Sequence, residues 1–315
     1  MLDVCICTHN PNRQLFEIIL QALANQTLSK DRYQVWVIDN ASDRLIEIAD
    51  LAILSVAAIN FKLLLAPRLG LMYAREVAIS ATSAEWMVFV DDDNELTPNY
   101  LATALELAEN NPKLGCFGGK LLLPKDTRHA NWVKAMLPYL AIKDMGDTVL
   151  SNCVNYWGEW EPPGAGSVLK REVLEVFQRR IATLSPQFVL GRQGKSLLSA
   201  EDSMITRGAY ELGLECAYQP RLELIHHLKP QRFTFRYLLR LLYGYGRSYV
   251  LLERILGNPV AAIEGWSMIT FIIRRITVRI KDTQSIQECL CMVAWDLGYL
   301  HESRQIQESY IILVG

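Results

Sequence analysis

Residues 86–96 have the sequence Trp-Met-Val-Phe-Val-Asp-Asp-Asp-Asn-Glu-Leu. The first five residues are β-branched, aromatic or otherwise apolar, which is typical of a buried strand. A buried strand does not tolerate three adjacent carboxylates, so we expect Asp91, Asp92 and Asp93 at its C-terminal end, where α/β sheets bind ligands. Carboxylate oxygens gathered there indicate a divalent cation and, through it, a phosphate-bearing substrate. The alternative interpretation is a solvated acidic turn.

The composition of the chain is that of a globular protein with a large core, since half of its 315 residues are hydrophobic. A formal net charge of −2 gives no electrostatic reason to expect a nucleic-acid partner. The seven cysteines form no C-x-x-C pair and have no histidine at zinc-site spacing. The first residues have the pattern of a strand and not of a signal peptide, so we expect a cytoplasmic protein.

The hydrophobic pattern of the first 110 residues alternates between strands and helices. We expect strands at 2–7, 34–39, 61–65 and 86–91, and amphipathic helices at 13–25, 43–54, 70–83 and 98–110. This order is typical of an α/β fold with a mostly parallel sheet and helices on both faces. The expected later elements are a strand at 114–123, a loop-rich region through Gly166, helices from Lys170 and at 203–212, and almost continuous helix after Phe233.

Polar side chains also follow the first two expected strands. The first strand continues into Thr8-His9-Asn10-Pro11-Asn12-Arg13, and the second into Asp39-Asn40-Ala41-Ser42-Asp43. Asp39 has the acceptors to bind a base or a ribose, whereas Ser42 or Asp43 is explained by capping of the next helix. Arg75 lies in the first turns of its expected helix and opposes the helix dipole. It therefore predicts an anionic partner, such as a phosphate or Asp91, with an ordinary exposed arginine as the alternative.

Taken in order, these segments resemble the nucleotide-sugar-binding half of family-2 glycosyltransferases with the GT-A fold. The resemblance implies that Asp39 recognises the base, commonly uracil, and that Asp93 binds Mg²⁺ or Mn²⁺ bridging the diphosphate. The residues that it implies for binding of the nucleotide-sugar donor are Thr8, Asn10, Arg13, Asp39, Asn40, Arg75, Asp91 and Asp92. The metal ligands that it implies are Asp93, Asp91 and His227. His9 stands where tyrosine is frequent in the family, which leaves the identity of the donor more open than the fold.

The second half of the chain contains a candidate acceptor segment, Glu161-Pro-Pro-Gly-Ala-Gly-Ser167. Its prolines give a rigid start, and its small residues let the backbone approach a ligand closely. The segment resembles the acceptor-side Gly-Ala motif of the family, and a plain turn is the alternative. Trp157 and Trp160 present aromatic faces for a sugar ring or for core packing. The predicted acceptor residues are Trp160, Gly164, Ala165 and Gly166.

Two carboxylates, Glu201 and Asp202, precede the helix expected at 203–212. Acidic residues are ordinary at a helix N-terminus, but the resemblance implies that this pair carries the catalytic base of inverting members. We assign the base to Asp202, with Glu201 as second choice, because displacement at an anomeric carbon needs a carboxylate to accept the proton of the acceptor hydroxyl. Later in the chain, the resemblance favours His227 over His226 as a further metal or diphosphate contact.

The sequence predicts a catalytic domain at 1–232, with a nucleotide-sugar half at 1–115 and an acceptor half at 116–232. A helical C-terminal region is expected at 233–315. No stretch is both long and uncharged enough to be expected to span a membrane. The basic residues there, Arg274, Arg275, Arg279 and Lys281, suit an anionic membrane surface on the cytoplasmic face. Helices that pack on the catalytic domain or form a dimer contact are the alternative.

The predicted function is that of a metal-dependent inverting glycosyltransferase of hexosyl or N-acetylhexosaminyl type. It would move a sugar from a nucleotide-diphosphate donor, commonly UDP-linked, to a glycan or lipid-linked acceptor in polysaccharide or glycolipid biosynthesis. A sugar-nucleotide nucleotidyltransferase would need a glycine-rich loop after the first strand, and residues 8–13 contain no glycine. A non-catalytic sugar-nucleotide-binding module should have lost the acidic triplet or the late carboxylate pair, and both are present.

Overall fold

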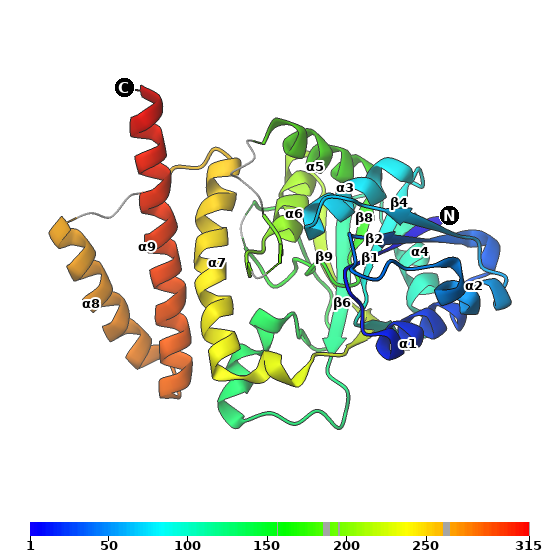
Figure 1. The fold of residues 1–315 in the computed structure, drawn as a ribbon, viewed down its shortest axis with the longest axis horizontal. Coiled ribbons are helices and arrows are strands. Elements are labelled where there is room, and N and C mark those ends of the chain that lie inside the picture. The colour runs from blue at the N-terminus through cyan, green and yellow to red at the C-terminus, as the bar shows by residue number, and fades with distance from the viewer. Residues whose placement is uncertain (156, 185–189, 195, 261–264, 315) are drawn as a thin grey trace. The chain divides into compact units, whose positions relative to one another are not determined.

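The computed structural model describes residues 1–155, 157–184, 190–194, 196–260 and 265–314 (Figure 1). The chain divides into two compact units. The sheet unit contains Met1–Thr127, Ala141–Thr183 and Glu201–Leu228, and the helical unit contains Arg128–Leu140, Leu184–Ala200 and Lys229–Gly315. The functional division at residue 232 stays a prediction, because compactness does not test it.

Within the described residues, the sheet unit contains a mixed sheet of nine strands in the order β3-β2-β1-β4-β8-β6-β9-β5, with β7 paired to β9. The neighbours β3, β2, β1 and β4 are parallel to one another. Strand β8 runs antiparallel to both β4 and β6, and β5 antiparallel to β9. The strands are β1 Leu2–Thr8, β2 Tyr33–Asp39, β3 Phe61–Leu65, β4 Trp86–Asp91, β5 Asn94–Leu96, β6 Leu114–Leu122, β7 Leu150–Asn152, β8 Val168–Lys170 and β9 Glu215–His226.

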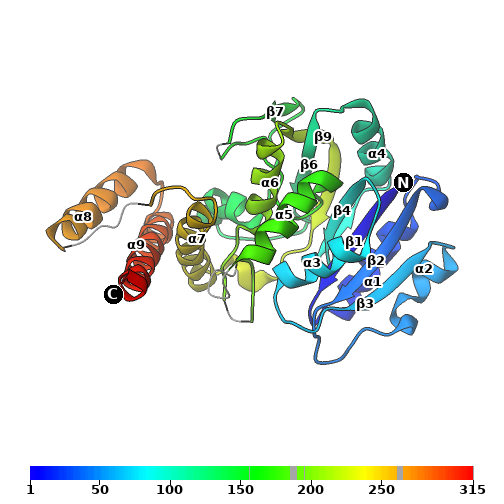
Figure 2. The ribbon, with the colours of Figure 1, turned by 90° about the horizontal axis from the view of Figure 1, so that it is seen from above.

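Helices cover both faces of this sheet (Figure 2). The main core joins one face of β1, at Leu2, Val4 and Ile6, to side chains from α1, α2 and α4. Helix α5 contacts both α3 and α6, and these three helices pack on the other face. Every residue of β1 and β2 is buried, which agrees with their predominantly apolar sequences. The helices are α1 Arg13–Ala24, α2 Ala52–Val56, α3 Leu71–Ala81, α4 Tyr100–Asn110, α5 Arg171–Thr183 and α6 Glu201–Glu211, with short 3₁₀ helices η1 Lys30–Arg32 and η2 Ile48–Leu51.

One predicted helix begins later than expected. The sequence predicts a helix over 43–54 with a cap at Ser42 or Asp43, but η2 begins at residue 48 with Glu47 as its N-cap. The capping prediction was wrong because the backbone after β2 folds around the Asp39 carboxylate. Glu47 and Asp50 form a capping box instead, in which each side chain accepts from the backbone N–H of the other.

Within its described residues, the helical unit contains three long helices and two 3₁₀ segments, and the long helices account for the almost continuous helix expected after Phe233. Helices α7 and α9 pack side by side (Figure 1). A Cβ atom on Gly246 would lie 1.9 Å from the carbonyl oxygen of Trp295, and one on Gly298 would lie 2.0 Å from that of Tyr243. Glycine therefore sets the close approach of the two backbones. No described helix is long and apolar enough to cross a bilayer. The bounds are η3 Asn131–Leu140, η4 Pro230–Phe233, α7 Phe235–Ile255, α8 Gly265–Asp282 and α9 Ile286–Val314.

Candidate active site

The C-terminal ends of β1, β2 and β4 meet at one edge of the sheet. Strand register places Thr8 beside Asp39, and Cys7 beside Asp91. The predicted polar residues therefore come from adjacent strand ends, as expected for parallel strands that bind a ligand at their carboxyl edge. This edge of the sheet unit is the candidate active site.

Asp39 organises the loop after β2. Its Oδ1 accepts a hydrogen bond from the backbone N–H of Ser42 at 2.9 Å, and its Oδ2 accepts one from the N–H of Ile46 at 2.7 Å. The side chain is buried. Each carboxylate oxygen has two lone pairs, so these bonds do not exclude the predicted contact with a nucleotide base. That contact stays a prediction.

Asn40 holds the segment that leads into α3. Its Nδ2 donates to the carbonyl oxygens of Ala66 at 3.1 Å and Arg68 at 2.7 Å, and its Oδ1 accepts from the N–H of Gly70 at 2.8 Å. Gly70 is the N-cap of α3 and has a φ of 136°, which favours glycine. Both amide hydrogens of Asn40 are used within the protein, so the structure supports a positioning role, and the donor contact predicted for it stays untested.

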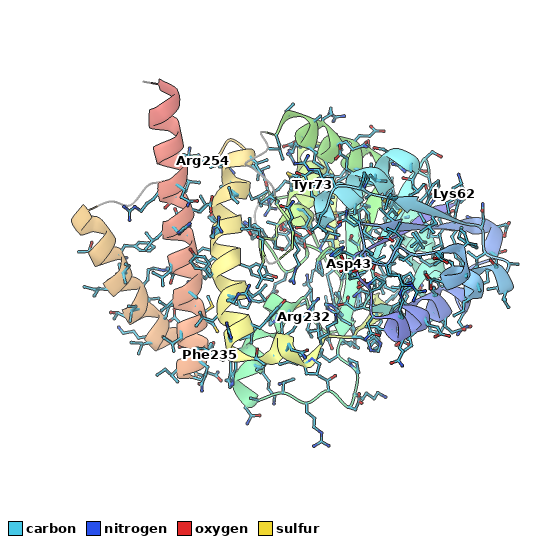
Figure 3. All side chains as sticks on the ribbon, viewed as in Figure 1. Asp43, Lys62, Tyr73, Arg232, Phe235 and Arg254 are labelled. Carbon is cyan, nitrogen blue, oxygen red and sulfur yellow. The ribbon has the colours of Figure 1, made fainter. Side chains whose placement is uncertain are left out.

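Asn10 and Arg13 fix the same loop from the β1 side. Asn10 donates through Nδ2 to Asp43 at 2.9 Å and accepts from the Asp43 N–H at 2.9 Å; Asp43 is labelled in Figure 3. Arg13 forms an ion pair with Asp50 at 2.7 Å. The ring of His9 lies with Nδ1 2.9 Å from the carbonyl oxygen of Asn40. These contacts build one wall of the site, and contacts of Asn10 and Arg13 with a donor stay predictions.

The acidic triplet lies where β4 turns into β5. Asp92 accepts a short hydrogen bond from the hydroxyl of Thr8. Asn94 ties the turn together, because its Oδ1 accepts from the Asp91 N–H at 3.1 Å and its Nδ2 donates to Asp93 at 3.2 Å. The carboxylates of the triplet therefore lie at the C-terminal end of β4, as the sequence predicts.

The register of β5 against β9 decides which histidine reaches the triplet. Asn94 pairs with His226, so the Nε2 atom of His226 lies 3.4 Å from Oδ1 of Asp93. His227 instead has Nε2 2.7 Å from Oε2 of Glu95. Successive side chains of a strand point to opposite faces, so only one of the two rings can face Asp93. The structure brings His226, and not the predicted His227, to that carboxylate.

The donor atoms at the triplet fit a divalent cation. Asp91 and Asp93 offer carboxylate oxygens, the hard ligands that Mg²⁺ and Mn²⁺ prefer. The buried Nδ1 atom of His226 has no hydrogen-bond partner within the described residues. In the described part of the chain, however, no three His, Cys, Asp or Glu side chains are already grouped as a metal site.

Arg75 connects the donor edge with the late carboxylate pair. Its side chain is only 2% exposed, its Nη1 lies 3.5 Å from Oε1 of Glu201, and its guanidinium packs over the ring of Phe89. Burial by itself lowers the pKa of Arg75, but the charges of Glu201, Asp91 and Asp202 overcome that effect and leave the pKa raised. The predicted anionic partner of Arg75 therefore exists. It is a cluster of three carboxylates from β4 and α6.

Gly164 joins this cluster through its backbone. Its N–H donates to Oδ2 of Asp202 at 3.1 Å, while Oδ1 of Asp202 accepts from the N–H of Ser203 at 2.8 Å. A Cβ atom on Gly164 would lie 2.4 Å from Nη2 of Arg75, so glycine is needed for the guanidinium to fit. The acceptor segment and the carboxylate pair, which are distant in sequence, are thus brought together.

Ala165 and Gly166 anchor the same segment to β4. Ala165 is buried in the main core. The N–H of Gly166 donates to the carbonyl of Phe89 at 2.9 Å, and its φ of +69° favours glycine. A Cβ atom there would also lie 2.4 Å from Leu224. Both residues are explained by packing, and a direct acceptor contact stays a prediction for each.

A second buried ion pair, which the sequence reasoning missed, lies behind the acceptor segment. Arg207 donates a short hydrogen bond to Glu161, and the hydroxyl of Tyr210 donates to the same oxygen at 2.9 Å. Burial raises the pKa of Glu161, and Arg207 offsets this only in part. Trp160 donates through Nε1 to the Tyr210 hydroxyl at 2.9 Å, and Arg207 lies 4.8 Å from the Trp157 ring centre. The helix that carries Arg207 is mixed polar and apolar in sequence, so its local pattern gives no signal for a buried anionic partner.

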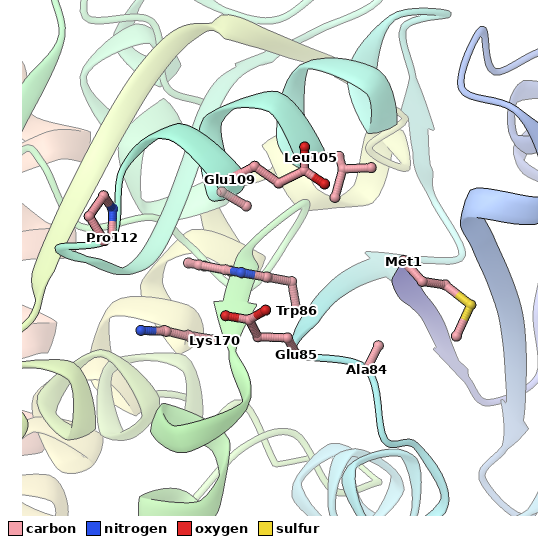
Figure 4. A pocket seen from close by; sticks show the side chains of 9 residues that line it. Met1, Ala84, Glu85, Trp86, Leu105, Glu109, Pro112 and Lys170 are labelled. Atoms are coloured by element: carbon pink, nitrogen blue, oxygen red, sulfur yellow. The ribbon is translucent and has the colours of Figure 1, made fainter.

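A cavity of about 400 Å³ lies at the other end of the strands (Figure 4). Two of its charged groups have partners, since Glu109 pairs with Arg32 at 2.8 Å and Lys170 with Glu172 at 2.6 Å. It is separate from the acidic triplet, because it is formed where β1 and β4 begin. Its lining residues are Met1, Ala84, Glu85, Trp86, Leu105, Ala108, Glu109, Pro112 and Lys170.

Comparison with known proteins identifies relatives of this fold. The mannosyltransferase PcManGT from Pyrobaculum calidifontis, solved with GDP-Man and Mn²⁺, is 15% identical with a TM-score of 0.53, over 99% of this chain and 75% of that one. TarS 1–349 from S. aureus is 15% identical with a TM-score of 0.47, over 98% of this chain and 90% of that one. None of the curated proteins matches the chain in sequence. The likeness to PcManGT shows the fold, and the fold is GT-A.

Family membership follows from the sequence match. The family described as glycosyl transferase family 2 matches residues 3–177. This range is more than half of the 315 residues and includes every strand-end residue of the candidate site up to Gly166. The chain belongs to glycosyl transferase family 2.

Proposed function

We propose that this glycosyltransferase uses a divalent cation and a nucleotide-diphosphate sugar to glycosylate a glycan or lipid-linked acceptor, with inversion at the anomeric carbon. The nucleotide that we propose is UDP. The observation that carries the proposal is the buried Arg75, which links Asp91 at the donor edge to Glu201 and Asp202 on α6. A protein that only bound sugar nucleotides would need the donor edge alone. The linked carboxylate pair supplies the further chemistry that a transfer needs.

The donor side of the proposal rests on the edge formed by β1, β2 and β4. The nucleotide would lie against the loop that Asp39 and Asn40 organise, with its diphosphate at the acidic triplet. The complex of PcManGT with GDP-Man and Mn²⁺ supports a nucleotide sugar as donor. The preference for UDP follows from the family resemblance of the strand-end motifs.

Asp93 and Asp91 are the proposed metal ligands, because their carboxylates lie at the strand end where the diphosphate would be. When bound, Mg²⁺ or Mn²⁺ stabilises the charge that develops on the departing nucleoside diphosphate. His226 is the proposed imidazole neighbour, since its ring faces Asp93. His227 is the second candidate, and its ring would first have to break its contact with the Glu95 carboxylate.

Asp202 is the better candidate for the catalytic base. Glu201 is buried and paired with Arg75, so its charge is committed to the cluster. Asp202 is less buried and accepts one backbone N–H on each oxygen, which leaves lone pairs for a hydroxyl proton. In this proposal Asp202 accepts the proton of the acceptor hydroxyl, and Glu201 positions Arg75.

The acceptor would approach along the segment from Trp160 to Gly166. The N–H of Gly164 holds Asp202, so an acceptor bound on this segment would meet the base directly. Trp160 is fixed by Tyr210, which makes its ring a rigid platform for a sugar. We place the reaction at the cytoplasmic face of a membrane, where a lipid-linked acceptor would be presented.

The test of the base compares Asp202→Asn with Glu201→Gln in single-turnover transfer, with saturating donor and metal. Asparagine keeps the size of aspartate but cannot accept the proton, so transfer should fall by about two to four orders of magnitude while donor affinity is kept. Glu201→Gln should have a smaller effect on transfer and should lower thermal stability. Near-normal turnover in Asp202→Asn with loss in Glu201→Gln would move the base to Glu201. Full activity in both would refute the pair.

The test of the metal site is titration calorimetry of Asp93→Ala with UDP and Mn²⁺. The variant should remain folded, because a strand-end carboxylate contributes little to the core, but its metal-dependent affinity for UDP should be lost. The matched control is Asp126→Ala, an exposed loop carboxylate of the sheet unit outside the candidate site, which should keep the affinity for UDP. Undiminished affinity in Asp93→Ala would remove this residue from the metal site.

A further inference from the structure

Helix α8 exposes an apolar stripe. Ile273, Ile276 and Ile280 are 60%, 37% and 64% exposed. At about 100° per residue, their spacing of three and four places them within roughly 60° of one another on the helix surface. Soluble proteins rarely leave such a stripe uncovered without an interaction partner.

The opposite side of α8 packs on α9. Phe271 stacks on Tyr299 with ring centres 6.4 Å apart. Arg275 and Arg279 both pair with the buried Asp296, at 2.7 Å and 3.0 Å. These contacts fix the rotation of α8 and direct the isoleucines away from α9.

The same ion pairs change the predicted basic surface. Two of its four cations, Arg275 and Arg279, are directed toward α9 by their ion pairs with Asp296, whose single charge compensates one of the two. Arg274 and Lys281 remain exposed. They lie seven residues apart and thus on one flank of the isoleucine stripe. The surface that remains is mainly apolar, with two cations along its side.

We propose that α8 lies in the plane of a membrane interface, with its isoleucine stripe among the acyl chains and Arg274 and Lys281 at anionic headgroups. An apolar helix face with flanking cations is the pattern of an interfacial amphipathic helix. This proposal deepens the membrane contact of the proposed function and rests on that part of it, but not on the transfer chemistry. It differs from attachment through a basic patch, because apolar insertion now makes the larger contribution.

Charge favours a lipid surface over a second copy of the chain as the occupant. In an isologous, antiparallel pair of α8 helices, each flank meets its own copy. Arg274 and Lys281 would then face the same two cations of the partner and repel them. Anionic headgroups would instead neutralise both residues, each contributing a modest attraction.

The experiment is flotation of the full chain with vesicles of phosphatidylcholine, alone or mixed with phosphatidylglycerol. Ile276→Ser with Ile280→Ser should lower binding to the mixed vesicles by more than about tenfold, because two apolar side chains no longer leave water. Arg274→Gln with Lys281→Gln should lower it by about tenfold or more on mixed vesicles only. The matched control is Ile18→Ser with Val56→Ser, two exposed apolar residues of the sheet unit, and it should bind normally.

Two outcomes would overturn the proposal. Unchanged flotation of the isoleucine variant would show that this stripe does not contact lipid. Absence of flotation in the wild type, together with self-association that the isoleucine variant abolishes in sedimentation velocity, would assign the stripe to a second copy. Asp202→Asn should still float, so failure of the proposed chemistry would be separate from failure of this inference. Because the substituted isoleucines are exposed, unchanged thermal unfolding would verify that the variants fold.

Discussion

Replacement of Gly164 by alanine tests the junction between the acceptor segment and Arg75. The new Cβ would lie 2.4 Å from Nη2 of Arg75, well inside ordinary contact distance. The guanidinium cannot yield cheaply, because it is buried and lies between Glu201 and the ring of Phe89. We therefore expect Arg75 to move by about 1 Å and the cluster of carboxylates to lose its arrangement.

The cost of Gly164→Ala follows from that displacement. At an effective dielectric constant of about 20, unit charges 3.5 Å apart attract by roughly 5 kcal/mol, and at about 4.5 Å by roughly 4 kcal/mol. Loss of attraction between Arg75 and Glu201 is thus about 1 kcal/mol, and overpacking adds about 1–3 kcal/mol. We expect the free energy of unfolding to fall by about 2–4 kcal/mol in total. A misplacement of about 1 Å should also lower transfer by about a hundredfold.

The assay is a double-mutant cycle with Arg75→Lys, read by chemical unfolding and by single-turnover transfer. Lysine has no Nη2 atom, so Gly164→Ala should cost much less in the Arg75→Lys background than in the wild type. The coupling between the two sites should therefore exceed about 0.5 kcal/mol. Equal costs of Gly164→Ala in both backgrounds would refute the argument, because the clash with Arg75 would then not be the cause.

Three further predictions concern other contacts. Gly246→Ala should lower the melting temperature in thermal unfolding, because its Cβ would lie 1.9 Å from the Trp295 carbonyl and separate α7 from α9; an unchanged value would contradict the close crossing. Asp39→Asn should lower the free energy of chemical unfolding by about 1–3 kcal/mol. Asparagine keeps one acceptor oxygen, but its amide nitrogen cannot accept the second of the two backbone N–H groups, those of Ser42 and Ile46, that Asp39 accepts. Burial lowers the pKa of Lys143 from 10.5 to about 8, so between those pH values the unfolded chain binds a proton that the folded chain does not. The stability of the wild type relative to Lys143→Met should therefore rise with pH through that window, and a pH-independent difference would contradict it.

The sheet and its ligand-binding edge were predictable because they depend on local patterns. Strands expected at 34–39 and 86–91 are present, and parallel pairing is sufficient to bring Asp39 and Asp91 to one edge. The loop after β2 was not predictable in this way. There Asp39 accepts two backbone N–H groups, which delays the helix to Ile48, and propensity alone does not report a hydrogen bond between a strand end and its following loop.

The two histidines show a second limit of sequence reasoning. Adjacent residues at a strand end point in opposite directions, so the sequence indicates that the two rings diverge, but not which of them lies toward the triplet. The choice depends on the register between β5 and β9, in which Asn94 pairs with His226. A slip of one residue would present His227 instead. Register is set by the packing of the whole sheet and not by the local sequence.

Arginines on helices show most clearly which ion pairs can be predicted from the sequence and which cannot. Arg75 lies near the positive end of the dipole of α3, so the sequence alone indicates an anionic partner, and Glu201 provides it. Arg275 and Arg279 lie in the C-terminal half of α8, where the dipole favours a cation, and the sequence therefore gave no reason to expect a buried partner. Their partner, Asp296, comes from the next helix and is visible only in the tertiary structure. Of the basic patch expected from composition, the fully exposed cations are thereby Arg274 and Lys281, and the exposed isoleucines of α8 become the larger part of its surface.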